Sequence, residues 1–210
     1  MSSILDPLKR VQRLRDADRR REHDAGRDRL PPGQVLTQKF PVLSYGPNPY
    51  IDLKTWRLKV WGLVEEPREF TWEEFMQLPR QRQVCDIHCV TRWSKLDTVW
   101  EGVPFREIVQ LVKPKLEAGY VMEHSYGGYT TNVPLEELLD DDVLLAFKYD
   151  DQPLEPDHGG PMRLLVPKLY FWKSAKWLRG LEFLATDKAG FWEMYGYHMH
   201  GDPCTEERFS

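Results

Sequence analysis

The chain has 210 residues, of which 41% are hydrophobic, and it carries a formal net charge of −4. This length suffices for one well-packed domain, and the negative charge argues against a nucleic-acid partner, which needs a basic surface. No apolar run approaches the roughly 18 residues that span a bilayer, so no membrane span is expected. Three cysteines without an apolar leader do not form a secreted disulfide framework, so we expect a cytoplasmic protein.

The composition divides the chain into three predicted parts. Residues 1–30 are dense in Arg and Asp and poor in large apolar residues, which predicts a charged tail. Residues 31–190 form the predicted domain. The aromatic-rich residues 191–210 predict an arm that packs on that domain. His198 and His200 lie in this arm, but two ligands without a third nearby are weak support for a metal site.

Strands and short helices interleave irregularly along the predicted domain. A period-two pattern predicts a strand over 55–61, and Thr71 with Glu74 has the spacing of a capping box that begins a helix. Further strands are predicted at 84–89, 119–125, 143–149, 162–166 and 177–184, and helices at 105–112 and after Pro134. These patterns predict an α+β fold with mixed β-sheets and short helices.

Cys89 ends the predicted strand at 84–89, where a rigid scaffold presents reactive groups. His88 and Arg92 are close in sequence, and nearby positive charge favours the thiolate, the form that binds soft metals. A zinc site shared with Cys85 is disfavoured, because four extended residues separate the two thiols by roughly 13 Å. A thiol enzyme that uses His88 is weakened, because adjacent strand residues face opposite sides. A buried structural thiol is the alternative.

A second candidate segment contains His158, Arg163 and Lys176. Two glycines after His158 let the backbone approach a ligand closely, and an arginine fork can grip a phosphate through two hydrogen bonds. The aromatic run at 170–172 suits a flat, phosphorylated molecule. A solvated basic loop is the alternative reading, but the apolar flanks indicate that several cations face inward, and buried cations need partners such as phosphate.

Four motifs in the second half of the chain resemble the molybdenum-cofactor domain of the sulfite oxidase family. They are Asp142-Val143-Leu144-Leu145-Ala146-Phe147, Asp157-His158-Gly159, Pro161-x-Arg163-x-x-Val166-Pro167 and Lys176-Trp177-Leu178. The similarity runs from about Phe40 to Leu184 in the family's order, and the compact prokaryotic branch is the most similar. The fold that this resemblance implies is the sulfite-oxidase-like molybdopterin-binding fold.

The resemblance also implies a cofactor and an activity. Cys89 corresponds to the protein ligand of molybdenum, and so to the catalytic residue. The positions that correspond to molybdopterin contacts are Ser44, Tyr45, Ser125, His158, Arg163, Ser174, Ala175 and Lys176. The implied activity is oxygen-atom transfer or related two-electron chemistry on a small-molecule substrate, with an electron-transfer partner that the sequence does not identify.

Two departures from the family argue against sulfite as the substrate. Phe147 stands where sulfite oxidases place an active-site tyrosine, and it has no hydroxyl group. Leu43 stands where they carry an arginine for the anionic substrate. Phe147 is expected either to line an apolar substrate pocket or to be a core residue of its strand. The alternative function is a non-catalytic module that binds a pterin or a phosphate compound on the same scaffold.

Overall fold

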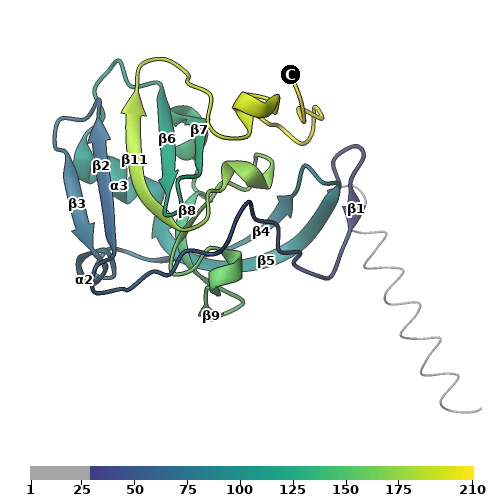
Figure 1. The fold of residues 1–210 in the computed structure, drawn as a ribbon, viewed down its shortest axis with the longest axis horizontal. Coiled ribbons are helices and arrows are strands. Elements are labelled where there is room, and N and C mark those ends of the chain that lie inside the picture. The colour runs from purple at the N-terminus through teal and green to yellow at the C-terminus, as the bar shows by residue number, and fades with distance from the viewer. Residues whose placement is uncertain (1–28) are drawn as a thin grey trace, which may run out of the picture.

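The computed structural model describes residues 29–210, so the predicted charged tail lies outside the described residues except for its last two positions. Two β-sheets form the fold (Figure 1). The six-stranded sheet contains β1 (Val35–Leu36), β4 (Gln81–His88), β5 (Trp93–Pro104), β8 (Leu144–Tyr149), β9 (Gln152–Pro153) and β10 (Arg163–Leu165). The five-stranded sheet has the order β3 (Arg68–Thr71), β2 (Arg57–Gly62), β11 (Leu178–Leu184), β6 (Tyr120–Ser125) and β7 (Thr130–Pro134).

Both sheets are mixed, and the helices are short. The β1–β5 and β2–β11 pairs are parallel, whereas the other pairs are antiparallel. The α-helices are α2 (Trp72–Phe75), α3 (Phe105–Val112) and α4 (Leu135–Leu138). Three 3₁₀ helices follow, η1 (Pro156–His158), η2 (Phe171–Lys173) and η3 (Glu193–Tyr195). The predicted α+β class with mixed sheets and short helices is therefore confirmed.

The capping box predicted at Thr71 is present and begins α2. The Thr71 hydroxyl accepts a hydrogen bond from the Glu74 amide at 3.2 Å, and the Glu74 carboxylate accepts one from the Thr71 amide at 2.8 Å. The helix ends at Phe75. Pro79 disfavours helical geometry in the preceding residue, so the last turn continues as i→i+3 bonds up to Leu78.

Strand β5 differs most from the sequence analysis, which predicts no strand between residues 90 and 104. The turn after β4 is short, because the Cys89 amide donates to the Trp93 carbonyl at 2.8 Å and β5 begins at Trp93. Charged residues interrupt the apolar pattern of this strand, and Asp97 has a positive φ of 54°. Such a strand carries little periodic signal, although it pairs with β1, β4 and β8.

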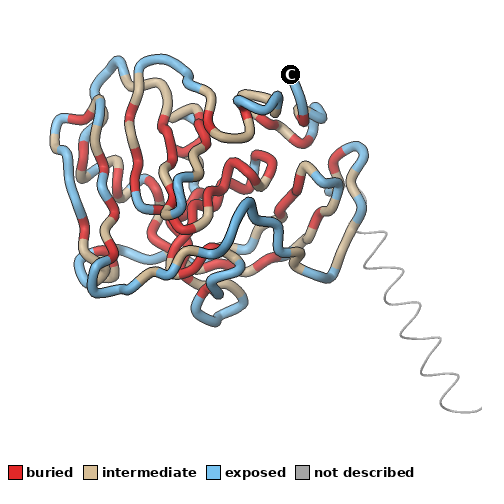
Figure 2. Tube along the Cα trace, viewed as in Figure 1, coloured by how far each residue is buried: buried red, intermediate tan, exposed pale blue. Residues whose placement is uncertain are grey.

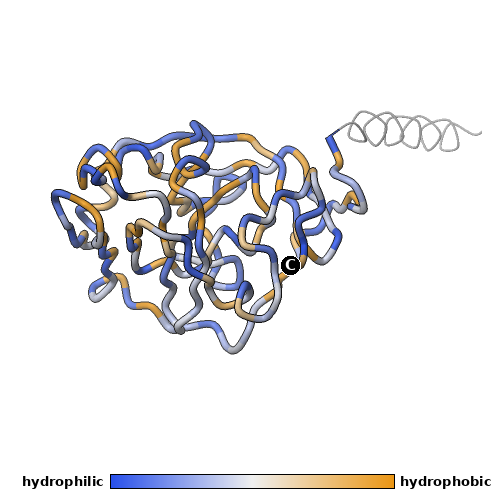
Figure 3. The backbone as a smooth tube through the Cα atoms, turned by 90° about the horizontal axis from the view of Figure 1, so that it is seen from above, coloured by the Kyte–Doolittle hydropathy of each residue, from blue (hydrophilic) through white to orange (hydrophobic). Residues whose placement is uncertain are grey.

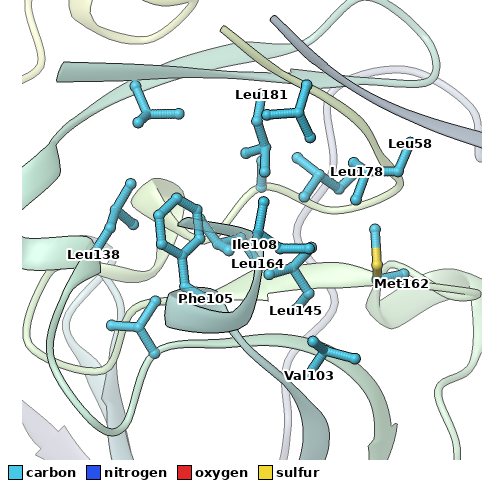
Figure 4. Packing of buried hydrophobic residues seen from close by; sticks show 14 of the residues in the cluster. Leu58, Val103, Phe105, Ile108, Leu138, Leu145, Met162, Leu164, Leu178 and Leu181 are labelled. Atoms are coloured by element: carbon cyan, nitrogen blue, oxygen red, sulfur yellow. The ribbon is translucent and has the colours of Figure 1, made fainter. Parts of the chain in front are cut away.

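A large hydrophobic core lies between the two sheets, and the buried face of α3 packs into it. Figure 4 shows Phe105 and Ile108 of α3, with Leu178 and Leu181 of β11 on one side and Leu145 of β8 on the other. All five side chains have no exposed surface. Burial of each such side chain contributes about 1.5–3 kcal/mol to folding, so this layer fixes the relative position of the sheets.

A smaller core lies on the other face of β8. Its fully packed members are Ile87, Trp100, Leu144, Ala146, Leu154 and Leu165. Alternate residues of a strand face the same side, so Arg163 and Leu165 share one face of β10 while Leu164 faces the large core. This alternation directs the Arg163 guanidinium group away from the large core. The group lies instead against the rings of Trp100 and Phe171, beside the smaller core.

The segment that joins β10 to β11 passes through the interior. Residues 162–178 are almost continuously buried, as the red stretch in the centre of Figure 2 shows. Elsewhere the tube alternates between hydrophobic and hydrophilic over short distances (Figure 3), as expected for strands with one buried face. No helix within residues 29–210 is both long and apolar enough to cross a membrane.

Candidate functional site

A cavity of about 420 Å³ lies where the segment 40–45, the turn after β4, the segment 171–177 and the arm from residue 191 meet. The structure brings eight of the nine predicted site residues to its wall: Ser44, Tyr45, Cys89, His158, Arg163, Ser174, Ala175 and Lys176. These residues come from positions up to 132 apart in the sequence, as for the bond between Ser44 and Lys176. A volume in this range is typical of a site for a cofactor or small ligand.

Cys89 lies at the end of β4 and is 7% exposed. Its Sγ is 3.2 Å from the Thr91 hydroxyl, and its carbonyl accepts a hydrogen bond from the Gln34 side chain at 3.1 Å. Burial raises the pKa of the thiol, whereas the Thr91 bond and the charge of Arg208 lower it. The cation that favours the thiolate is therefore Arg208 of the arm, rather than the sequence neighbours His88 and Arg92. A bound metal ion would replace the proton.

The His88 side chain is not available as a base for Cys89. Its Nδ1 lies 2.8 Å from the Ser94 hydroxyl, and burial lowers the pKa of the imidazole. His88 pairs with Ser94 in the β4–β5 register. The cavity wall does not include His88, which agrees with the opposite orientation of adjacent strand residues.

Arg163 is 1% exposed and places its guanidinium group against the cavity. The group donates to the His158 carbonyl at 2.9 Å and the Ser174 carbonyl at 2.6 Å, and it lies 4.0 Å from the ring centroid of Phe171. Burial lowers the pKa of Arg163 to about 9, which leaves the group charged at neutral pH. Among residues 29–210 it forms no ion pair with a carboxylate.

Lys176 and His158 extend this positive region. The Lys176 ammonium group donates to the Ser44 hydroxyl at 2.8 Å and to the Asp157 carbonyl at 2.7 Å. Burial, followed by the charge of Arg163, lowers the pKa of Lys176 to about 8. Burial and the charges of Arg163 and Lys176 also lower the pKa of His158, whose ring stacks on Phe40 at 3.9 Å.

The donor set around this end of the cavity fits an anion. Two cations, Arg163 and Lys176, are held by neutral oxygens, and the charge of Arg163 lowers the pKa of Lys176. A phosphate group would satisfy both, because charge-assisted hydrogen bonds to phosphate are stronger than bonds to carbonyls. A thiol and an anion-binding region therefore share one cavity, as a metal-containing cofactor with a phosphate group requires.

The remaining predicted contacts have different surroundings. Ser174 and Ala175 line the cavity through the segment between η2 and β11, and the Ser174 hydroxyl accepts the Val166 amide at 2.9 Å. Tyr45 is 72% exposed and lies over the Phe191 ring at 4.8 Å. Ser125 is not part of the cavity wall; it is buried at the end of β6, and its hydroxyl has no partner among the described residues. Its role stays a prediction.

Phe147 does not line the cavity, so of its two expected positions the core residue is found and the pocket residue is not. The ring is 5% exposed in the large core, where it meets Phe75 edge-on at 6.3 Å. The alternation of β8 explains this position, because residues 145 and 147 face the large core and residues 144 and 146 face the smaller one. Leu43, in contrast, does line the cavity.

Several cavity residues were missed in the sequence. Tyr129 lines the cavity, donates to the Trp172 carbonyl at 2.7 Å, and has a pKa that burial raises well above its usual value. A tyrosine after Gly127-Gly128 is a weak local signal, although the glycine pair marks a close approach of the backbone. Phe191, Trp192 and Tyr197 come from the arm, and the sequence gives no indication of which of its aromatic rings face inward.

The arm is anchored by buried polar contacts. Glu193 accepts hydrogen bonds from the Thr131 hydroxyl at 2.8 Å and the Trp172 indole at 2.9 Å, and it pairs with Lys173 at 2.7 Å. Farther along, His200 lies between Glu137 of α4 and Glu207, at 3.0 Å and 2.9 Å. These contacts hold the aromatic wall of the cavity in place.

Comparison with known proteins agrees with this geometry. The family model "Oxidoreductase molybdopterin binding domain" matches residues 45–192. The chain therefore belongs to this family, the sulfite-oxidase-like molybdopterin-dependent oxidoreductases, which use a molybdenum–molybdopterin cofactor.

The relatives place the chain more closely within that family. It is 49% identical to the uncharacterized oxidoreductase YuiH of Bacillus subtilis, over 87% of this chain and 92% of the relative. It is 32% identical to the putative protein-methionine-sulfoxide reductase subunit YedZ1 of Azospira oryzae and 26% identical to sulfite oxidase of Arabidopsis thaliana, over 81% and 80% of this chain. The chain spans only 66% and 54% of the length of those two proteins.

A solved structure supports the fold. The sulfane dehydrogenase SoxCD of Paracoccus pantotrophus is similar with a TM-score of 0.60 and 24% identity, over 66% of this chain and 40% of that chain. This similarity confirms the sulfite-oxidase-like molybdopterin-binding fold that the sequence motifs implied.

Proposed function

We propose that this molybdopterin-dependent oxidoreductase carries out oxygen-atom transfer, or related two-electron chemistry, on a small or sulfur-containing substrate other than sulfite. The observation that carries the proposal is the shared cavity, in which the Cys89 thiol faces the same space as Arg163 and Lys176. A pterin with a phosphate group and a metal requires both features in one enclosure.

The chain's own residues take distinct roles in this proposal. Cys89 supplies the thiolate ligand to molybdenum. Arg163 and Lys176 hold the phosphate group, with Ser44 beside Lys176 and the Ser174–Ala175 backbone beside Arg163. The bound cofactor supplies the two-electron redox chemistry, and the protein positions it and limits the access of water.

The walls that remain for the substrate are mostly apolar. They include Leu43, Val90, Phe191, Trp192 and Tyr197. No Asp or Glu of the described part of the chain, residues 29–210, lines the cavity, and the leucine at position 43 supplies no charge for an anionic substrate. Burial keeps the Tyr129 hydroxyl protonated, so this residue adds no negative charge to the cavity while it donates to the Trp172 carbonyl. These features support a neutral substrate, and the printed name of YedZ1 supports one that contains sulfur.

Element analysis of the purified protein tests the proposal. After expression in a host that synthesises the cofactor, we expect about one molybdenum atom per chain together with a pterin that fluoresces after oxidative release. Reduction by a low-potential donor should change the visible absorption of the bound centre, and a sulfoxide should reverse the change. Protein that contains neither molybdenum nor pterin under these conditions would refute the proposed activity.

The anion-binding region gives a pH-dependent prediction. Because a bound anion favours the charged ammonium group, anion affinity should fall as the pH rises through the Lys176 pKa of about 8. Sulfate keeps a constant charge over this range and is a suitable probe for cofactor-free protein. We expect an affinity loss of about tenfold between roughly pH 7 and pH 9, as for a lost charge-assisted bond. Lys176→Met should bind sulfate more weakly at pH 7 and lose less affinity up to pH 9, where the remaining loss comes from Arg163 with its pKa of about 9. A slope as steep as that of the wild type in this variant would contradict the assignment.

We also propose that the protein acts in a reducing compartment and receives or delivers electrons through a separate partner. All three cysteines are free, including the exposed Cys204, which supports the first point. The second follows from the reaction, because two-electron turnover at one centre needs an external donor or acceptor.

A further inference from the structure

A carboxyl group that the proposed function does not use lies directly behind the cavity. Glu123 is on β6 and has no exposed surface. Because side chains alternate along a strand, it shares the interior face of β6 with Val121 and Ser125, whereas Met122 and His124 face the other side. An acidic residue is seldom fully buried without a specific partner.

The two oxygens of Glu123 have different surroundings. Oε2 accepts a hydrogen bond from the Ala175 amide at 2.9 Å, whereas Oε1 is buried without a partner among residues 29–210. Ala175 lines the cavity, and its amide has no partner in a strand or helix of the described structure. The carboxyl group therefore satisfies a buried donor that would otherwise be costly to leave unpaired.

The segment Ser174–Lys176 is fixed from two sides. On the side of β10, the Ala175 carbonyl accepts the Leu164 amide at 3.0 Å, and the Ser174 carbonyl accepts the Arg163 guanidinium at 2.6 Å. On the side of β6, the hydrogen bond from the Ala175 amide to the Glu123 carboxyl group holds the segment. Loss of that bond would let the segment turn about its β10 contacts, and this segment carries Lys176 and orients Arg163.

We propose that Glu123 is a positioning residue for the anion-binding region, which it shapes by holding the Ala175 amide and so fixing the orientation of Arg163 and Lys176. This inference rests on the proposed function only in identifying the anion as the phosphate of the cofactor. The residue touches neither the cavity nor the reacting atoms.

The protonation state of Glu123 is compatible with this role. Burial raises its pKa well above the usual value, although the Ala175 amide and the charge of Lys173 act in the opposite direction. Glu193 also raises it, and Arg163 lowers it. A neutral acid accepts the amide bond without cancelling the positive charge of Arg163, which stays available to an anion from the cavity.

Two substitutions separate the hydrogen bond from the charge. Glu123→Gln keeps an acceptor for the Ala175 amide and is neutral, whereas Glu123→Leu has similar size and no acceptor. The probes are sulfate affinity of cofactor-free protein and the molybdenum-to-protein ratio of protein purified from a cofactor-producing host. Glu182→Gln on the adjacent strand β11 is the matched control.

We expect Glu123→Gln to bind sulfate within about threefold of the wild type, and Glu123→Leu to bind it about 5- to 100-fold more weakly. The molybdenum ratio should fall in the leucine variant alone. Equal losses in the glutamine and leucine variants would overturn the proposal, because charge and not the hydrogen bond would then be responsible. Wild-type sulfate affinity in the leucine variant would overturn it as well.

If the leucine variant does not fold, hydrogen exchange of the Ala175 amide in Glu123→Gln tests the positioning role. The Ala175 amide of Glu123→Gln should keep wild-type protection, and its loss in this folded variant would overturn the proposal. Failure of the proposed function has a different signature. Protein without molybdenum that still shows the sulfate difference between the two variants would refute the cofactor but not the positioning role.

Discussion

Cys89→Ser is expected to lower turnover by more than about 100-fold, which is the upper end of the effect seen when residues behind a metal ligand are replaced. A serine hydroxyl is a harder and far less acidic donor than a thiol, and it is a poor ligand for a metal that prefers thiolate. The substitution keeps the shape of the side chain, and the Thr91 hydroxyl remains within reach of the new oxygen. The measurement is steady-state reduction of a sulfoxide, with the pterin content determined in parallel.

The pterin content should stay close to that of the wild type, because Arg163 and Lys176 are unchanged. Cys85→Ser is the matched control, since this thiol lies four residues earlier in the same strand and contacts Thr98 at 3.8 Å outside the cavity. Substantial turnover in Cys89→Ser, or an equal loss in Cys85→Ser, would exclude Cys89 as the metal ligand.

Lys173→Met is expected to cause the largest loss of stability. The ammonium group has no exposed surface and pairs at 2.7 Å with Glu193, which is equally buried at its side chain. Removal of one partner of a buried pair leaves an uncompensated charge, which typically costs about 3–5 kcal/mol. For a protein of this size the midpoint of thermal unfolding should fall by roughly 6 to 20 °C, measured by calorimetry.

The double substitution Lys173→Met with Glu193→Gln should recover part of this loss, because the glutamine is neutral and still accepts the bonds from Thr131 and Trp172. Lys59→Met is the control, since that lysine is exposed on β2. A change below about 2 °C in Lys173→Met would show that the pair contributes little and that the pocket admits water.

The elements with strong local signals were predicted well. The capping box at Thr71 and the helix at 105–112 depend on hydrogen bonds and side-chain spacing within one or two turns, and both are present. Strand β5 was missed because its stability comes from three neighbouring strands and not from its own pattern.

The site residues, too, were predicted only where a signal lies in the local sequence. Arg163 and Lys176 stand in short motifs and Cys89 ends a predicted strand, and the structure brings the three together in one cavity. The position of Phe147 stayed open between the cavity and the core, because a sequence motif does not show which face of β8 a side chain occupies. Glu123 gave no signal, since its importance depends on a cross-strand approach to Ala175. Tertiary contacts of this kind are invisible in a single sequence.

The arm from residue 191 has a consequence for access to the cavity. Three of its rings, Phe191, Trp192 and Tyr197, belong to the cavity wall, about a hundred positions after Cys89. The wall is therefore complete only while the arm is docked through Glu193. Undocking of the arm would expose the thiol and the anion-binding region to solvent without disturbing either β-sheet.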